Sequence, residues 1–80
     1  PPPRKTKLSY KDQRDYDLLP TRITEIDAEI ARDEALLSDA TLYSRDPARF
    51  AALTDAVAKA RAEKDAAEER WLELAEQVEG

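Results

Sequence analysis

Apolar residues recur at alternating spacings of three and four along the C-terminal half of the chain. This is the heptad repeat of a helix that buries one stripe of its surface against another helix. The series consists of Phe50, Leu53, Val57, Ala60, Lys64, Ala67, Trp71, Leu74 and Val78, of which Lys64 alone is polar. The pattern predicts one long helix that needs a partner helix.

A shorter apolar series lies upstream and provides that partner. It consists of Tyr16, Leu19, Ile23, Ile26, Ile30 and Leu37. The segment between Leu37 and Phe50 is short enough for the chain to fold back on itself. The sequence therefore predicts an all-α protein, an antiparallel two-stranded coiled-coil hairpin that forms within one monomer and packs Ile26 on Val57.

Local signals place the start of the first helix and an interruption within it. Ser9, followed three residues later by Asp12, has the form of a capping box, which predicts a helix from Tyr10. Pro20 cannot donate a hydrogen bond to the carbonyl of Tyr16, so the helix either kinks or ends there. We favour an end at residues 18 and 19, which gives a short N-terminal helix over about 10–18 and a second helix over about 20–37.

The third helix has a clear start signal. Asp46 followed by Pro47 provides an N-cap and a first-turn proline. We expect this helix to cover residues 47–78. The ordered domain would then comprise residues 9–80, preceded by a basic, proline-rich linker over residues 1–8.

Charge favours one of two registers that the apolar seam allows. In the first, Ile26 lies beside Val57, Arg22 comes near Glu63, and Asp15 comes near Arg70. The second, shifted by one heptad, confronts Arg22 with Arg70. Exposed ion pairs are weak, at about 0.2 to 1 kcal/mol each, but repulsion between like charges still discriminates between registers. We expect the first register, in which Lys64 must extend its ammonium group past the seam.

Composition agrees with a helical rod and not with an enzyme core, since 39% of the residues are charged and only one is glycine. No apolar run approaches the roughly 20 residues that a membrane span requires, and the sequence contains no signal-peptide pattern. The chain begins with three prolines and contains no methionine. We therefore expect a domain excised from a longer protein, without a membrane partner.

The net charge of −5 conceals two surfaces of opposite sign. Residues 1–14 carry a net charge of +4, and residues 15–80 carry a net charge of −9. Because screening acts over about 8 Å at physiological salt, a polyanion would sense the positive part locally. The basic arm consists of Arg4, Lys5, Lys7, Lys11 and Arg14. It is either a solvated linker or a phosphate-binding segment.

Aromatic residues beside basic ones can stack on nucleic-acid bases. Tyr10 lies within the basic arm and is a candidate contact of this kind. Tyr16 and Trp71 occupy heptad positions, so we expect them to pack at the open end of the hairpin. We expect Tyr43 to cover Phe50 at the loop.

The residue types give no support to catalysis or metal binding. The chain has no histidine, no cysteine and no glycine-rich phosphate loop. Paired acids such as Glu68 and Glu69 lie on a solvated helix face. Glu25 and Glu29 have the spacing to share a divalent ion, but a solvated charged face is the simpler interpretation. We expect no catalytic residue, metal ligand or cofactor in this domain.

Four short motifs occur in order along nearly the whole chain. They are residues 7–14 (KLSYKDQR), Leu19-Pro20 with Arg22 and Ile23, residues 42–47 (LYSRDP) with Phe50, and residues 69–74 (ERWLEL). Together they resemble the C-terminal domain of ABC-F ATPases of the Uup type.

The resemblance implies a cytoplasmic parent ATPase whose two preceding cassettes use ATP and Mg and act on the ribosome or in nucleic-acid metabolism. It implies that this domain is a coiled-coil appendage that binds DNA. Carried over to this sequence, the contacts are the basic residues around Lys7, Lys11 and Arg14.

Two classes of function follow. The first is a module that contacts phosphates of DNA or ribosomal RNA without reading bases, through Arg4, Lys5, Lys7, Tyr10, Lys11 and Arg14. The second is a structural or regulatory coiled coil that docks on its own ATPase cassettes, the ribosome or a protein partner. The basic arm favours the first class.

Overall fold

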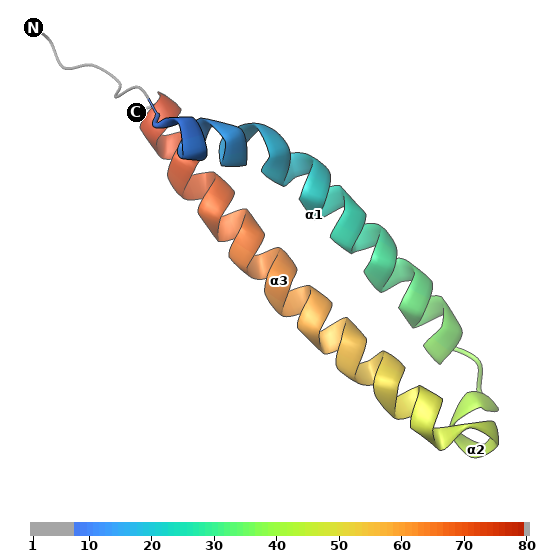
Figure 1. Cartoon of the computed structure of the whole chain (residues 1–80). Coiled ribbons are helices and arrows are strands. Elements are labelled where there is room, and N and C mark those ends of the chain that lie inside the picture. The colour runs from blue at the N-terminus through green and yellow to red at the C-terminus, as the bar shows by residue number, and fades with distance from the viewer. Residues whose placement is uncertain (1–7, 80) are drawn as a thin grey trace, which may run out of the picture.

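The computed structural model describes residues 8–79 as a hairpin of two long helices. Helix α1 spans Tyr10–Leu37, α2 is a short turn of helix over Leu42–Arg45, and α3 spans Pro47–Glu79. The 33 residues of α3 extend over about 50 Å at 1.5 Å per residue. The long helices run side by side in opposite directions, with α2 at the closed end (Figure 1). The predicted all-α helical hairpin is confirmed.

The predicted seam contains most of the buried residues, and Leu42 and Ala75 are the buried residues among 8–78 that lie outside it. Every member of the two apolar series is buried or half-buried. Ile26, Ile30 and Val57 form the central cluster, against which Leu37 and Ala60 pack. Because each side chain in this cluster comes from a heptad position, the apolar pattern alone accounts for how α1 packs on α3.

The register is the first of the two alignments. Arg22 donates to the Glu63 carboxylate through Nε at 3.0 Å and Nη2 at 2.7 Å. Arg70 Nη2 lies 3.5 Å from Asp15 Oδ2. Both pairs were expected for this register, and the shifted register would have brought Arg22 and Arg70 together.

The start of α1 is capped by Ser9, as predicted. The Asp12 amide donates to Ser9 Oγ at 3.1 Å. The carboxylate of Asp12, which a complete capping box would direct back to the Ser9 amide, instead accepts a hydrogen bond from Arg70 at 2.6 Å. The first turn of α1 is therefore tied to α3 as well as to its own cap.

The predicted break before Pro20 is wrong, because α1 continues through this residue. The short N-terminal helix over residues 10–18 is thus the beginning of α1, whose axis bends in this region (Figure 1). A proline within a helix removes one hydrogen bond and crowds the preceding turn, which usually kinks or ends the helix. Here the helix survives because a side chain of α3 replaces the missing donor.

That donor is Trp71. Its Nε1–H group donates to the carbonyl oxygen of Tyr16 at 3.2 Å. This is the carbonyl that the amide of residue 20 would bond in an uninterrupted helix, and proline has no such amide. The indole ring also stacks on the Tyr16 ring, with centroids 5.4 Å apart and planes inclined by 7°. The expected packing of Tyr16 on Trp71 is confirmed. The same tryptophan also satisfies a backbone carbonyl of α1.

The loop is built around two aspartates. Asp39 Oδ1 accepts hydrogen bonds from the backbone amide and the hydroxyl of Thr41, both at 2.9 Å. These hydrogen bonds to Thr41, aided by the charge of Arg45, lower the pKa of Asp39. Asp46 Oδ1 accepts from the Arg49 amide at 3.1 Å, which confirms the predicted N-cap of α3. Such capping explains why a short connection suffices.

The short helix α2 was not predicted. Leu42 in α2 is buried, and the neighbouring Tyr43 ring meets Phe50 edge to face at 5.2 Å. The expected cover of Phe50 by Tyr43 is confirmed. The turn of helix therefore closes the apolar end of the seam.

Lys64 extends past the seam, and it meets a partner that the sequence analysis missed. Its Nζ lies 2.6 Å from Asp27 Oδ1. The hydrogen bond that Lys64 donates to Asp27 raises the pKa of Lys64, against the opposing effect of partial burial. The heptad series locates Lys64 in the seam but does not show which acid on α1 its flexible stem can reach.

None of the helices in the described part of the chain is long and apolar enough to cross a membrane.

Trp71 and Pro20 provide a test of the backbone interaction. We expect Trp71→Phe to lower the free energy of unfolding by about 1 to 3 kcal/mol, because the Tyr16 carbonyl loses its donor in a half-buried place. Pro20→Ala should raise it by about 1 to 3 kcal/mol and supply an amide to the same carbonyl. Trp71→Phe should then cost less in the Pro20→Ala background. Urea unfolding of the four proteins measures this coupling, and equal costs in both backgrounds would contradict it.

Lys64→Leu should shift the thermal unfolding midpoint only slightly. The new side chain adds apolar area to the seam, but Asp27 loses its partner, and the two effects oppose each other. In the Asp27→Asn background, where no ion pair can be lost, the same substitution should raise the midpoint clearly. An equal shift in both backgrounds would show that the pair with Asp27 contributes nothing.

Candidate nucleic-acid interface

Of the six predicted contact residues, three can be placed. Arg4, Lys5 and Lys7 lie outside the described residues. Tyr10, Lys11 and Arg14 occupy the first turns of α1, at the open end of the hairpin, opposite the loop that carries α2 (Figure 1).

Tyr10 and Arg14 lie one helical turn apart and share one face of α1. The Tyr10 side chain is 84% exposed. Together with Gln13, Asp17 and Leu18, the two residues line a shallow groove of about 360 Å³. Within residues 8–79, Arg14 takes part in no ion pair. The groove thus presents an aromatic ring and an available guanidinium group side by side, as contact with a base and a phosphate requires.

Lys11 is less available, because it lies on the side of α1 that carries Asp15. Its Nζ is 3.5 Å from Asp15 Oδ2, one turn along the helix. Both groups face solvent, so an ion pair of this kind is weak and would exchange readily for a phosphate. The structure does not bring Lys11 into the groove with Tyr10 and Arg14.

The acids of these turns are compensated from the other helix. Arg70 of α3 approaches Asp12 at 2.6 Å and Asp15 at 3.5 Å. The hydrogen bond that Arg70 donates to Asp12 is the main cause of a raised pKa of Arg70, and Asp15 adds to it. Over residues 10–17, Lys11 and Arg14 stand against Asp12, Asp15 and Asp17, and Arg70 brings this net charge from −1 to zero. The surface near Arg14 is therefore less repulsive to an anion than its own sequence indicates.

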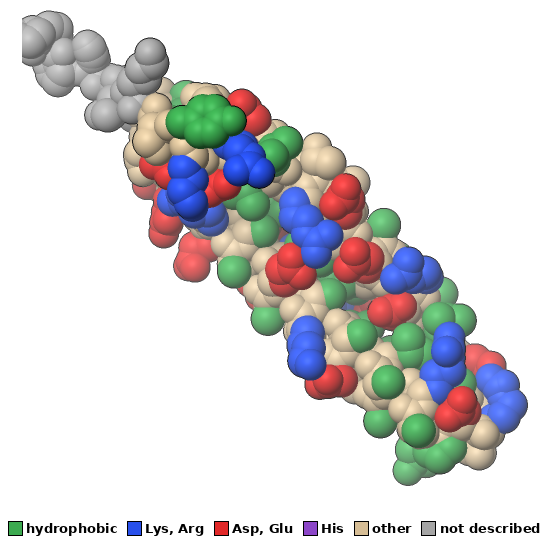
Figure 2. Space-filling view, in the orientation of Figure 1, with side chains coloured by type: hydrophobic (Ala, Val, Ile, Leu, Met, Phe, Trp, Pro, Cys, Tyr) green, Lys and Arg blue, Asp and Glu red, His purple; other side chains and the backbone are tan. Residues whose placement is uncertain are grey.

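The charge pattern of the rod limits this interface to its end. Figure 2 shows Lys and Arg side chains interleaved with Asp and Glu side chains along the visible face of the rod. In the middle, Arg22 lies 2.7 Å from Glu63, 3.4 Å from Glu25 and 3.6 Å from Glu29. Glu25 and Glu29, the pair with metal-binding spacing, thus share an arginine.

No group of three or more potential metal ligands occurs among residues 8–79.

Sequence reasoning identified the pairing of Arg70 with Asp15 but missed Asp12. The register that places Asp15 near Arg70 also brings the preceding turn of α1 within reach of the same guanidinium. The spacing of Asp12 and Asp15 on α1 is the signal for this second contact, and the capping-box pattern of Ser9 and Asp12 conceals it.

Comparison with known protein families finds one family that matches this chain. Residues 7–76 match the family described as ABC transporter C-terminal domain. No solved structure matches the chain.

Relatives of known name agree with this family. The chain is 46% identical over 78 residues to the ATP-binding protein Uup of Caulobacter vibrioides, covering 98% of this chain and 13% of that protein. It is 35% identical over 81 residues to the ATP-binding protein Uup of Haemophilus influenzae, covering 98% and 12%. A Uup-like ATP-binding protein of the same organism is 34% identical over 74 residues, covering 92% and 16%.

The chain thus spans less than a fifth of the length of these three relatives. The family match extends from just before the cap of α1 nearly to the end of α3, and it includes the residues that build the seam. The chain therefore belongs to the ABC transporter C-terminal domain family, as the C-terminal domain of a Uup-type ABC-F protein.

Proposed function

We propose that this domain is the nucleic-acid-binding appendage of an ABC-F ATPase, and that it contacts phosphates without reading sequence. The observation that carries the proposal is the exposed face of α1, where Tyr10 stands beside Arg14 and Arg14 has no acidic partner within residues 8–79. Arg70 supports this face by holding Asp12 and Asp15.

The basic arm extends this surface in the proposal. Arg4, Lys5 and Lys7 precede α1 directly in the sequence, so a strand bound at Arg14 would lie within reach of them. The acidic rod would repel the same strand, which confines binding to the end of the hairpin. DNA and ribosomal RNA share the phosphate chemistry, and the proposal requires only that chemistry.

The parent protein, in this proposal, hydrolyses ATP with Mg²⁺ on cassettes outside this chain. The names of the relatives as ATP-binding proteins support this assignment. The domain would supply affinity for nucleic acid and take no part in nucleotide chemistry.

Salt dependence tests the phosphate contacts. If all five cations of the basic arm meet phosphates of duplex DNA, the logarithm of the affinity should fall against the logarithm of salt with a slope of about 4 to 5, at roughly 0.9 per phosphate. Fluorescence anisotropy with labelled duplex DNA, single-stranded DNA and structured RNA measures this slope.

The matched control removes the same number of positive charges from another part of the rod. Lys11→Ala with Arg14→Ala should lower the slope by about 1 to 2. Lys59→Ala with Arg49→Ala should leave it nearly unchanged, although Lys59 is paired with Asp55 just as Lys11 is paired with Asp15. Equal binding by both double variants, or no binding by the unaltered chain, would reject the proposal.

Arg70 provides a second test, because it touches the interface only through Asp12 and Asp15. Arg70→Gln should weaken binding by roughly threefold to tenfold at low salt, since Asp12 would lose its partner and Asp15 would keep only Lys11. Arg70→Lys should largely restore binding. Arg22→Gln, which removes the ion pair with Glu63 farther along the same seam, is the control. If both Gln variants weaken binding equally, loss of hairpin stability explains the effect and compensation of the acids does not.

A further inference from the structure

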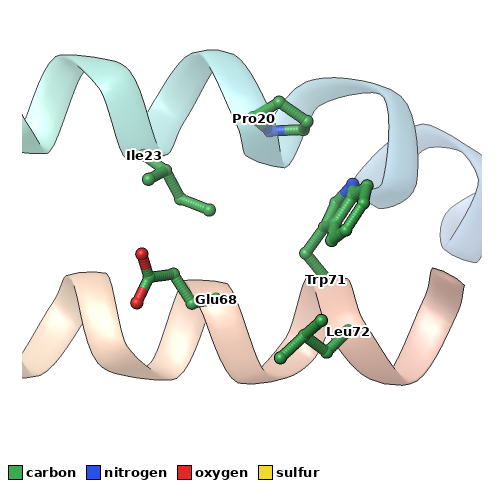
Figure 3. A pocket seen from close by; sticks show the side chains of 5 residues that line it. All are labelled: Pro20, Ile23, Glu68, Trp71 and Leu72. Carbon is green, nitrogen blue, oxygen red and sulfur yellow. The ribbon is translucent and has the colours of Figure 1, made fainter.

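A second surface lies on the flank of the hairpin, where Pro20 of α1 faces the last third of α3. A groove of about 450 Å³ runs between the helices here, lined by Pro20, Ile23, Glu68, Trp71 and Leu72. Figure 3 shows Trp71 reaching from α3 towards the turn that contains Pro20, with Ile23 and Glu68 at the other end of the groove. We call this surface the Leu72 groove.

The groove is apolar because the hydrogen bond from Trp71 to the Tyr16 carbonyl turns the indole ring towards α1. The ring then forms one wall of the groove. Pro20 contributes a ring without a polar group. Leu72 is 57% exposed and also lines the groove. A large exposed leucine beside an aromatic wall is typical of a binding groove.

Acidic residues surround Leu72. Glu68, Glu69 and Glu76 lie three or four positions away, so on a helix they are its immediate surface neighbours. The acids of this stretch are Asp65, Glu68, Glu69, Glu73 and Glu76, and none of them forms a close ion pair within residues 8–79, although the charges of Glu68 and Asp65 help to raise the pKa of Lys64.

Acidic residues elsewhere on the hairpin form ion pairs with basic residues. Glu63 pairs with Arg22, Asp27 with Lys64, and Asp55 with Lys59. Glu34 pairs with Arg61, and Asp33 with Arg32. The unpaired acids are thus concentrated on the same turns of α3 that expose Leu72. This concentration is costly for the isolated domain through self-repulsion, and a cationic ligand would relieve it.

We propose that the Leu72 groove binds a cationic protein segment that inserts one large aliphatic or aromatic side chain between Pro20 and Leu72. The inserted side chain would cover Leu72 and the Trp71 ring, and flanking Arg or Lys residues would meet Glu68, Glu69 and Glu76. The unpaired acids exclude an anionic occupant such as nucleic acid. They also disfavour a second copy of this face, which carries the same charge. This function goes beyond nucleic-acid binding and uses residues that take no part in it.

The chain carries its own reporter, because Trp71 is its single tryptophan and lines the groove. The probe is the capped peptide Arg-Arg-Leu-Arg-Arg, added to the full chain while tryptophan emission is recorded. We expect a saturable change in emission. The peptide Arg-Arg-Gly-Arg-Arg, which keeps the charge and removes the anchor, should bind at least about fivefold more weakly.

Matched variants locate the binding. Leu72→Ser should weaken the leucine peptide at least about fivefold, whereas Leu36→Ser, at another exposed leucine, should not. The triple variant Glu68→Gln, Glu69→Gln and Glu76→Gln should weaken it at least about tenfold at low salt. The control triple, Glu25→Gln, Glu34→Gln and Asp55→Asn, removes the same charge from paired acids and should have a much smaller effect.

Other results would overturn the proposal. If tryptophan emission shows no saturable change, the Leu72 groove does not bind the peptide. Specific binding at the groove is also rejected if the two peptides bind with equal affinity, or if the two triple variants have equal effects. If emission changes with protein concentration alone, a second copy is the occupant. If removal of residues 1–7 changes the emission and strengthens peptide binding, the leading segment of this chain is the occupant.

Discussion

The hairpin depends on one hydrogen bond that crosses between its helices, from the indole of Trp71 to the carbonyl of Tyr16. Pro20 leaves that carbonyl without its normal donor, and an unsatisfied carbonyl within a helix would favour a break. The indole supplies the donor, and its ring stacks on Tyr16 at the same time. The first turns of α1 therefore remain continuous with the rest of the helix and are held against α3. Both the proposed nucleic-acid interface and the Leu72 groove follow from this contact.

Charge acts differently along the rod. In the middle, pairs such as Arg22 with Glu63 and Lys64 with Asp27 lie on the flanks of the seam and discriminate between registers. At the open end, Arg70 is shared between Asp12 and Asp15, while the acids around Leu72 have no described partner. The net charge of the whole chain does not show this difference, because it sums the charges of all these regions. The two faces of the open end consequently suit ligands of opposite sign.

Much of the fold could be predicted from the sequence, because heptad positions, the Ser9 cap and the Asp46 cap are local signals with direct physical meaning. The register followed from charges that had only two plausible alignments. The continuity of α1 through Pro20 could not be predicted, since it depends on a donor 55 residues away. The pairing of Lys64 with Asp27 depends on the reach of a flexible side chain, which periodicity does not encode.

The candidate interface was predictable in its residue types but not in its surroundings. The clustering of Tyr10 and Arg14 on one face follows from helical spacing, whereas the compensation of Asp12 by Arg70 required the tertiary structure. The Leu72 groove gave no sequence signal, because Leu72 lies outside the heptad series and gains its setting from Pro20 on the opposite helix.

The placement of Trp71 also has a mechanical consequence. The chain enters the hairpin and leaves it at the same end (Figure 1), so a force that separates Leu8 from the end of α3 would peel the helices apart one contact at a time. Peeling would first load the packing of Leu74, which is buried beyond Arg70 on α3, then Arg70 with its two aspartates, and then Trp71 on Tyr16. Once these contacts part, the turn before Pro20 loses its borrowed donor, and the first turns of α1 would unwind together. The open end would thus yield as one unit, while the seam around Ile26 continues to bear the load.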